Sequence, residues 1–223
     1  MTSKSRASRR EAARQQPGRS PSRWLLPVAG LVIVVVAVVA VVMSQMSSPS
    51  AVVVPSSVPA VEPTITGDPL PAYKDTVGDT AKGLVAPVVQ GQDFQGHPVG
   101  IAPNGKPTMV VFAAHWCPHC QREVPVIQAW INAGRAPADV NLVSVSTAID
   151  PTAPNYPPEA WFAREGWTVP LIVDPTSTVG KAYGLGSYPF FVILDGSGKV
   201  FTRLAGEVAM SDLEKILASV PRS

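Results

Sequence analysis

The fold of this 223-residue chain is decided by residues 108–120, which read TMVVFAAHWCPHC. Residues 108–114 are almost entirely apolar, as in a buried strand. Pro118 suits the first turn of a helix, where its missing N–H costs nothing. The only two cysteines, Cys117 and Cys120, therefore lie at a predicted strand-to-helix junction. A Cys-x-x-Cys pair at this position can form and break a disulfide, because the helix N-terminus stabilises a thiolate on the first sulfur.

Strand and helix patterns alternate from residue 84 to the C-terminus, which predicts an α/β domain of about 140 residues. A leading hairpin is predicted from residues 85–89 and 97–101. The other predicted strands are 108–114, 140–147, 169–173, 190–194 and 199–204, and the predicted helices begin near residues 118, 158, 176 and 211. The domain organisation is completed by three segments before residue 84.

The first two segments predict a membrane anchor. Residues 24–43 are apolar and uncharged, and 20 helical residues at about 1.5 Å each match the hydrocarbon core of a bilayer. Residues 1–23 carry seven basic side chains against the single acid Glu11, a charge of +6 in a chain whose net charge is +2. The positive-inside rule then makes 1–23 a basic cytoplasmic tail and 24–43 a transmembrane signal anchor, with the following domain outside the cytoplasmic membrane.

Two alternatives exist for this N-terminal region. A cleaved signal peptide has the same layout, but its apolar run is usually about 7–15 residues long, and no Ala-x-Ala site follows here. Clustered arginines also attract phosphates, but next to a membrane span they indicate topology, so no nucleic-acid partner is expected. The third segment, residues 44–83, is rich in Pro, Ser and Val and predicts an extended linker.

From residue 84 the chain resembles the thioredoxin fold, and within it the membrane-anchored TlpA/DsbE-like thiol-disulfide oxidoreductases. The resemblance rests on residues 116–120 (WCPHC), Pro125 and residues 183–189 (YGLGSYP). It implies a thioredoxin-like domain with a central mixed sheet flanked by helices and an N-terminal β-hairpin extension. It also implies a cis peptide bond before Pro189, which makes Tyr188 and Pro189 a substrate-binding wall of the site. Trp116 is expected to be another part of that wall.

The two sulfurs are expected to have different roles. Cys117 is the predicted exposed, attacking nucleophile, and Cys120 is the predicted buried resolving thiol. His119 lies between them and can donate a hydrogen bond or a positive charge to the Cys117 thiolate. A stabilised thiolate stabilises the reduced protein and makes the disulfide a stronger oxidant. The dipeptide Pro118-His119 is that of DsbA-type oxidants, so the motif favours oxidation.

The chain also departs from the family pattern. Thioredoxins and several relatives place a buried acid six residues before the first cysteine, and Val111 occupies this position here. Deprotonation of Cys120 would therefore need another base or a water molecule. Arg122 and Glu123, which follow the motif, are predicted to be solvated helix charges, although either could influence Cys117.

Two alternative roles for the cysteines are disfavoured. A purely structural disulfide that closes so short a loop adds little stability. A zinc site formed by Cys117, Cys120, His115 and His119 would need four ligands within six residues to converge on a tetrahedron. We therefore expect no metal, and no cofactor other than the redox-active disulfide Cys117–Cys120.

The sequence thus predicts an extracytoplasmic thiol-disulfide oxidoreductase that exchanges disulfides with exported protein thiols and is recycled by a membrane redox partner. The first hypothesis is an oxidant. The second is a reductase of exported protein thiols, such as those of apocytochromes c. The third is a non-catalytic peptide-binding module that uses the groove at Tyr188 and Pro189.

Overall fold

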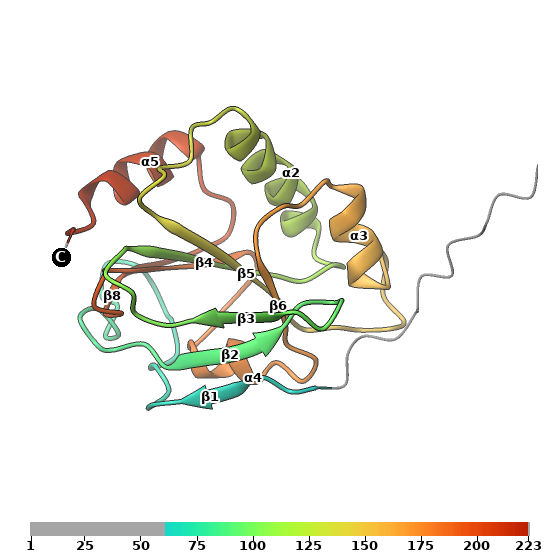
Figure 1. Ribbon diagram of the computed structural model, residues 1–223, viewed down its shortest axis with the longest axis horizontal. Coiled ribbons are helices and arrows are strands. Elements are labelled where there is room, and N and C mark those ends of the chain that lie inside the picture. The colour runs from blue at the N-terminus through green and yellow to red at the C-terminus, as the bar shows by residue number, and fades with distance from the viewer. Residues whose placement is uncertain (1–60, 223) are drawn as a thin grey trace, which may run out of the picture. The chain divides into compact units, whose positions relative to one another are not determined.

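A computed structural model describes residues 61–222, which contain a five-stranded mixed sheet. Its strands are β4 (Thr108–Ala113), β5 (Asn141–Ser146), β6 (Leu171–Val173), β7 (Phe190–Leu194) and β8 (Val200–Ala205). They lie in the order β6-β5-β4-β7-β8, with β4, β5 and β6 parallel and β7 and β8 antiparallel to their neighbours (Figure 1). The predicted mixed sheet is therefore confirmed.

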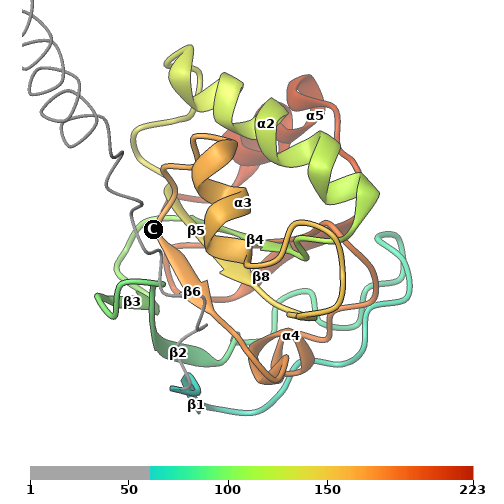
Figure 2. The ribbon, with the colours of Figure 1, turned by 90° about the vertical axis from the view of Figure 1, so that its right-hand side faces the viewer.

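Helices cover both faces of this sheet (Figure 2). They are α2 (Pro118–Asn132), α3 (Pro158–Arg164), α4 (Thr178–Ala182) and α5 (Met210–Ser219). Successive side chains of a strand point to opposite faces, and all six residues of β4 are buried. Met109 and Val111 pack with α2 and α5, whereas Val110 and Phe112 pack on the side of α4. The strand that leads into the two cysteines is thus fixed from both sides.

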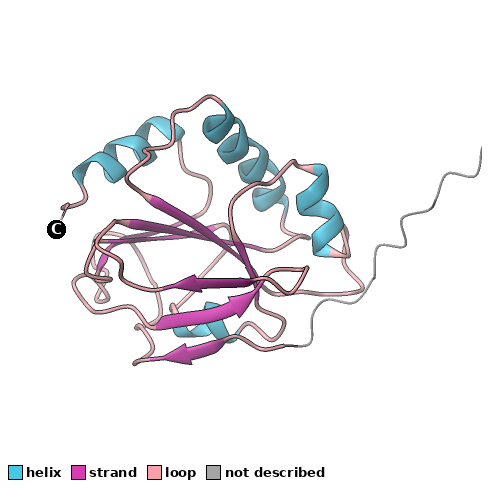
Figure 3. Cartoon of the chain, viewed as in Figure 1, coloured by secondary structure: helices cyan, strands magenta, loops and turns pink. Residues whose placement is uncertain are grey.

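A second, antiparallel sheet is formed by β1 (Thr64–Thr66), β2 (Val88–Gln92) and β3 (Pro98–Ile101) in that order (Figure 3). It confirms the predicted hairpin extension and adds a third strand. The extension approaches β6 closely, because a Cβ atom on Gly91 would lie 2.6 Å from Ile172 Cγ2. Glycine at this position therefore allows the two sheets to meet.

The prediction that residues 44–83 form a linker is wrong for residues 61–83, which we call the N-terminal strap. Ile65 pairs with Val89 in the sheet. Leu70 is 5% exposed, and its N–H donates to the carbonyl oxygen of Ala182 at 2.8 Å. The prolines favour extended backbone, as predicted, but extended backbone can also lie along a folded surface. The folded domain thus includes residues 61–83, which lie within the predicted linker.

Arg203 on β8 joins the strap to the loop that leads into β7. Its Nε and Nη2 donate to the Asp79 carboxylate at 2.9 and 2.5 Å. Its Nη1 donates to the carbonyl oxygens of Pro71 and Tyr183 at 2.8 and 2.9 Å. Tyr183 begins residues 183–189, which end at Tyr188 and Pro189, so the strap supports one predicted wall of the site.

The predicted tail, the span 24–43 and the first part of the predicted linker lie outside the described residues. Within residues 61–222, no helix is both long enough and apolar enough to cross a membrane.

Candidate active site

The two cysteines lie where β4 ends and α2 begins. Cys117 is the N-cap residue of α2, and Cys120 lies within its first turn. Both are free thiols. Cys117 retains 6% of its surface, whereas Cys120 is fully buried. The thiol of Cys117 donates to the carbonyl oxygen of Tyr188 at 3.8 Å. Cys117 is therefore buried rather than exposed as predicted, although an approaching sulfur can still reach it more readily than Cys120.

Cys120 lies in an environment that opposes ionisation. Burial raises the pKa of its thiol far above the ordinary value, and the charges of Cys117 and Glu123 raise it further. The N–H of Ala114 donates to the sulfur at 3.4 Å and partly offsets this effect. Cys120 is thus held as a thiol until a base removes its proton.

Glu123 supplies a buried carboxyl group near Cys120, so the prediction that its charge is solvated is wrong. It follows Cys120 by three residues, which places both side chains on one face of α2, and it is only 4% exposed. Its Oε1 accepts a hydrogen bond from the N–H of Val208 at 3.1 Å. Burial raises the pKa of Glu123, and the charge of Glu207 adds to this shift. A carboxyl group with a raised pKa near a buried thiol is suited to proton exchange with it.

Trp116 and Tyr188 form an aromatic wall beside Cys117. Their rings are edge to face, with centroids 6.0 Å apart. Trp116 Nε1 donates to the carbonyl oxygen of Ala148 at 2.7 Å, which fixes the indole ring. The peptide bond between Tyr188 and Pro189 is cis, as the resemblance implies. Burial raises the pKa of the Tyr188 phenol. The residues assigned to the substrate-binding wall are therefore brought together.

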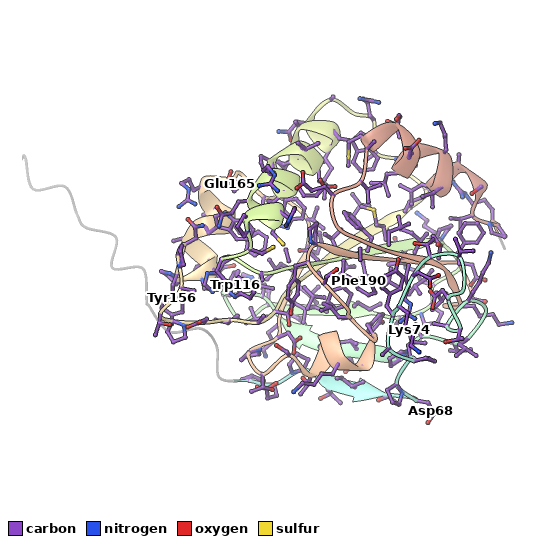
Figure 4. All side chains as sticks on the ribbon, turned by 180° about the vertical axis from the view of Figure 1, so that it is seen from behind. Asp68, Lys74, Trp116, Tyr156, Glu165 and Phe190 are labelled. Atoms are coloured by element: carbon purple, nitrogen blue, oxygen red, sulfur yellow. The ribbon has the colours of Figure 1, made fainter. Side chains whose placement is uncertain are left out.

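His115 is fully buried and binds the loop that follows β5. Its Nδ1–H donates to the carbonyl oxygen of Pro154 at 2.8 Å, and its Nε2 accepts from the N–H of Asp150 at 3.2 Å. Its ring is also edge to face with Tyr156. Figure 4 shows Trp116 and Tyr156 at the same end of the domain. His115 thus positions the loop beside the site.

In the described part of the chain, no three His, Cys, Asp or Glu residues form a group suited to a metal ion.

His119 and Arg122 extend from the first turns of α2 and meet Glu207, which lies between β8 and α5. Glu207 Oε1 is 2.7 Å from His119 Nδ1, 3.0 Å from Arg122 Nε and 2.6 Å from Arg122 Nη2. The hydrogen bonds from Arg122 and then His119 lower the pKa of Glu207. The expected partner of His119 was the Cys117 thiolate, whereas its Nδ1 is paired with Glu207. Pro118 lies exposed beside this group.

The sequence predicts no role in the site for Glu207, and it wrongly predicts that Glu123 is solvated. For Glu123 a signal exists, because a residue three positions after a buried helical residue shares its face. For Glu207 there is no such signal, because 88 residues separate it from His119. Only the return of the chain after β8 brings it to α2.

Comparisons with known proteins agree with this fold and site. The family model for Redoxin matches residues 66–217. The thiol-disulfide oxidoreductase ResA of Geobacillus kaustophilus is 27% identical over 141 residues, which cover 63% of this chain and 78% of that protein. The methylamine utilization protein MauD of Paracoccus denitrificans is 31% identical over 119 residues, covering 52% and 54% of the two chains. The crystal structure of StoA from Bacillus subtilis has a TM-score of 0.52 at 22% identity, covers 60% of this chain and 98% of its own, and shows the shared fold.

Proposed function

We propose an oxidising role for this chain, which belongs to the Redoxin family and is a thiol-disulfide oxidoreductase. A thiolate of an exported protein attacks Cys117 Sγ of the Cys117–Cys120 disulfide. The bond between the two cysteines breaks, a bond between Cys117 and the client forms, and the Cys120 sulfur leaves with a proton from the Glu123 carboxyl group. A second client thiolate then attacks the client sulfur. This last step yields a client disulfide and the reduced enzyme.

The N-terminus of α2 and the basic side chains on its first turns support the proposed direction, although Glu207 pairs with those side chains. The N-terminus of α2 favours an anion at Cys117, and the charge of Arg122 interacts with that sulfur. His119 adds a second basic group on the same turn. Each of these groups favours the Cys117 thiolate, which stabilises the reduced enzyme and drives disulfide donation.

The reduction potential of the full chain in detergent tests this direction. The chain is equilibrated with mixtures of reduced and oxidised glutathione, and a Cys120→Ser variant, which cannot form the internal disulfide, serves as the control. We expect a value nearer to that of DsbA, about −120 mV, than to that of thioredoxin, about −270 mV. A value near −270 mV would contradict the oxidising role.

A reductase of exported protein thiols, such as those of apocytochromes c, is the second candidate, because the buried Glu123 carboxyl group can exchange a proton with Cys120 in either direction. In this direction Glu123 removes the proton from Cys120, whose sulfur then attacks a mixed disulfide between Cys117 and the client. The redox state of the two cysteines in cells separates the candidates. A bridged pair supports the oxidant and free thiols support the reductase. Cys120→Ala should trap clients on Cys117 in both cases.

We also propose that residues 24–43 anchor the enzyme in the cytoplasmic membrane, with the catalytic domain outside and a membrane redox partner that reoxidises it. The basic tail and the apolar run support this topology. Protease treatment of intact spheroplasts is expected to remove the domain and leave a short membrane-bound fragment. Protection of the domain, or its release by alkaline carbonate without protease, would contradict the anchor.

A further inference from the structure

We propose that Glu207 limits the oxidising strength of the site by neutralising positive charge that His119 and Arg122 bring to Cys117. The proposal rests on the disulfide exchange proposed for Cys117. The hydrogen bonds of Glu207 go to His119 and Arg122 rather than to either sulfur. It is therefore a positioning residue that acts through its two partners on α2.

The backbone around Glu207 is fixed on both sides. The N–H of Gly206 donates to the carbonyl oxygen of Pro189 at 2.8 Å, and the N–H of Val208 donates to the Glu123 carboxylate at 3.1 Å. Gly206 has φ +87°, which glycine adopts without strain. Glu207 is thus held between Pro189 and α2, and its charge has a defined position relative to the active site.

His119 Nδ1 has two competing partners. Glu207 Oε1 lies 2.7 Å away and Arg122 Nη2 lies 2.8 Å away. A protonated Nδ1 donates to the carboxylate, whereas an unprotonated Nδ1 accepts from the guanidinium. Glu207 therefore selects the form with a proton on Nδ1 and at the same time pairs with Arg122. The three side chains together carry a charge of 0 or +1, according to the protonation of the imidazole.

The sign of the effect follows from this charge count. Glu207→Gln keeps an oxygen that accepts from both partners but removes one negative charge, so the Cys117 thiolate and the reduced enzyme become more stable. Arg122→Gln removes one positive charge and has the opposite effect. Because these groups are partly exposed, salt should weaken both effects.

The test is the equilibrium of the full chain in detergent with glutathione, in which two glutathione thiols reduce the Cys117–Cys120 disulfide and form one molecule of oxidised glutathione. We expect Glu207→Gln to raise the equilibrium constant for this reduction about threefold, or about 14 mV at 29.6 mV per tenfold change. Arg122→Gln should lower it by a similar factor, and the double variant should lie near the wild type.

Glu214→Gln is the matched control. Glu214 on α5 also pairs with an arginine, Arg135, at 2.9 Å and with similar exposure, but at the other end of α2. It should leave the equilibrium constant unchanged. The ultraviolet absorbance of the thiolate at fixed pH should increase in Glu207→Gln, and 1 M salt should reduce its shift in potential.

Equal potentials in Glu207→Gln and Glu214→Gln would overturn the proposal. A shift of the Glu207 and Arg122 variants in the same direction would also overturn it, because a loss of loop structure then accounts for both. The proposed function is tested separately, since it depends on the absolute potential of the wild type, whereas this inference depends on differences between variants.

Discussion

Replacing Asp79 with alanine would leave the guanidinium of Arg203 buried without a counter-charge. The Arg203 side chain has no exposed surface, and that of Asp79 is 4% exposed. Removing one partner of a buried ion pair costs about 3–5 kcal/mol. The hydrogen bonds from Arg203 to Pro71 and Tyr183 would survive, and two aromatic rings lie within 6.0 Å of the guanidinium. We therefore expect the lower end of this range, about 3 kcal/mol.

This loss can be measured on a fragment of residues 55–223, which contains all the described residues. Urea unfolding followed by tryptophan fluorescence gives the free energy of unfolding, because Trp130 and Trp161 are buried and report on the core. A change of about 1 kcal/mol shifts the Tm of a protein of this size by about 2–4 °C. Asp79→Ala should therefore lower the Tm by about 6–12 °C.

Asp139→Ala is the control, because Asp139 pairs with Arg222 at the surface. Its loss should change the stability little, because water and salt screen an exposed ion pair. The double variant Asp79→Leu with Arg203→Met should recover much of the stability, since apolar pairs often replace buried ion pairs without loss. If Asp79→Ala unfolds like Asp139→Ala, the strap does not pack as described and the extension of the domain before residue 84 is refuted.

Three further results are expected. Glu123→Gln should slow disulfide exchange with a dithiol peptide about 100-fold and flatten the pH dependence of the exchange rate, because the group that carries the proton is lost. Stopped-flow fluorescence measures this rate. An unchanged rate would exclude Glu123 from proton transfer. A fragment of residues 84–223 should have a lower urea midpoint than residues 55–223, because it lacks Asp79 and β1; equal midpoints would argue against the strap. The hydrogen bonds from Arg203 hold the pKa of Asp79 below its usual range. The Asp79 carboxylate therefore stabilises the fold fully above about pH 4, the usual pKa of an unfolded Asp. This stabilisation is lost as the pH falls through the lowered pKa of the folded protein. Asp79→Ala should then lose less stability than the wild type during acid titration, and parallel titration curves would contradict this.

The strands and helices could be predicted because their signals are local. The strand predicted over residues 108–114 is observed as β4, 108–113, since a run buried on both faces is continuously apolar. The cis bond before Pro189 followed from the resemblance. The helix predicted to begin near residue 176 begins only at residue 178, because Ser177 has a left-handed backbone and the helix starts after it.

The environment of charged and proline-rich segments could not be predicted in this way. Glu123 looks like a surface charge in the sequence, and only the N–H of Val208, which approaches from another element, makes its burial tolerable. The N-terminal strap has the composition of a linker, and its place in the fold depends on Arg203, which lies 124 positions after Asp79. Such partners become neighbours only when the chain has folded.

Glu207 links the charge at Cys117 to the supply of protons at Cys120. Its negative charge pairs with the basic groups beside Cys117 and also raises the pKa of Glu123. Glu207→Gln should therefore lower the pKa of Glu123 while it makes the disulfide more oxidising. The pH at which the exchange rate changes should move down in this variant, and Glu214→Gln should leave it in place. If the potential shifts but this pH does not, Glu123 is not the group that carries the proton, because the same charge acts on both residues.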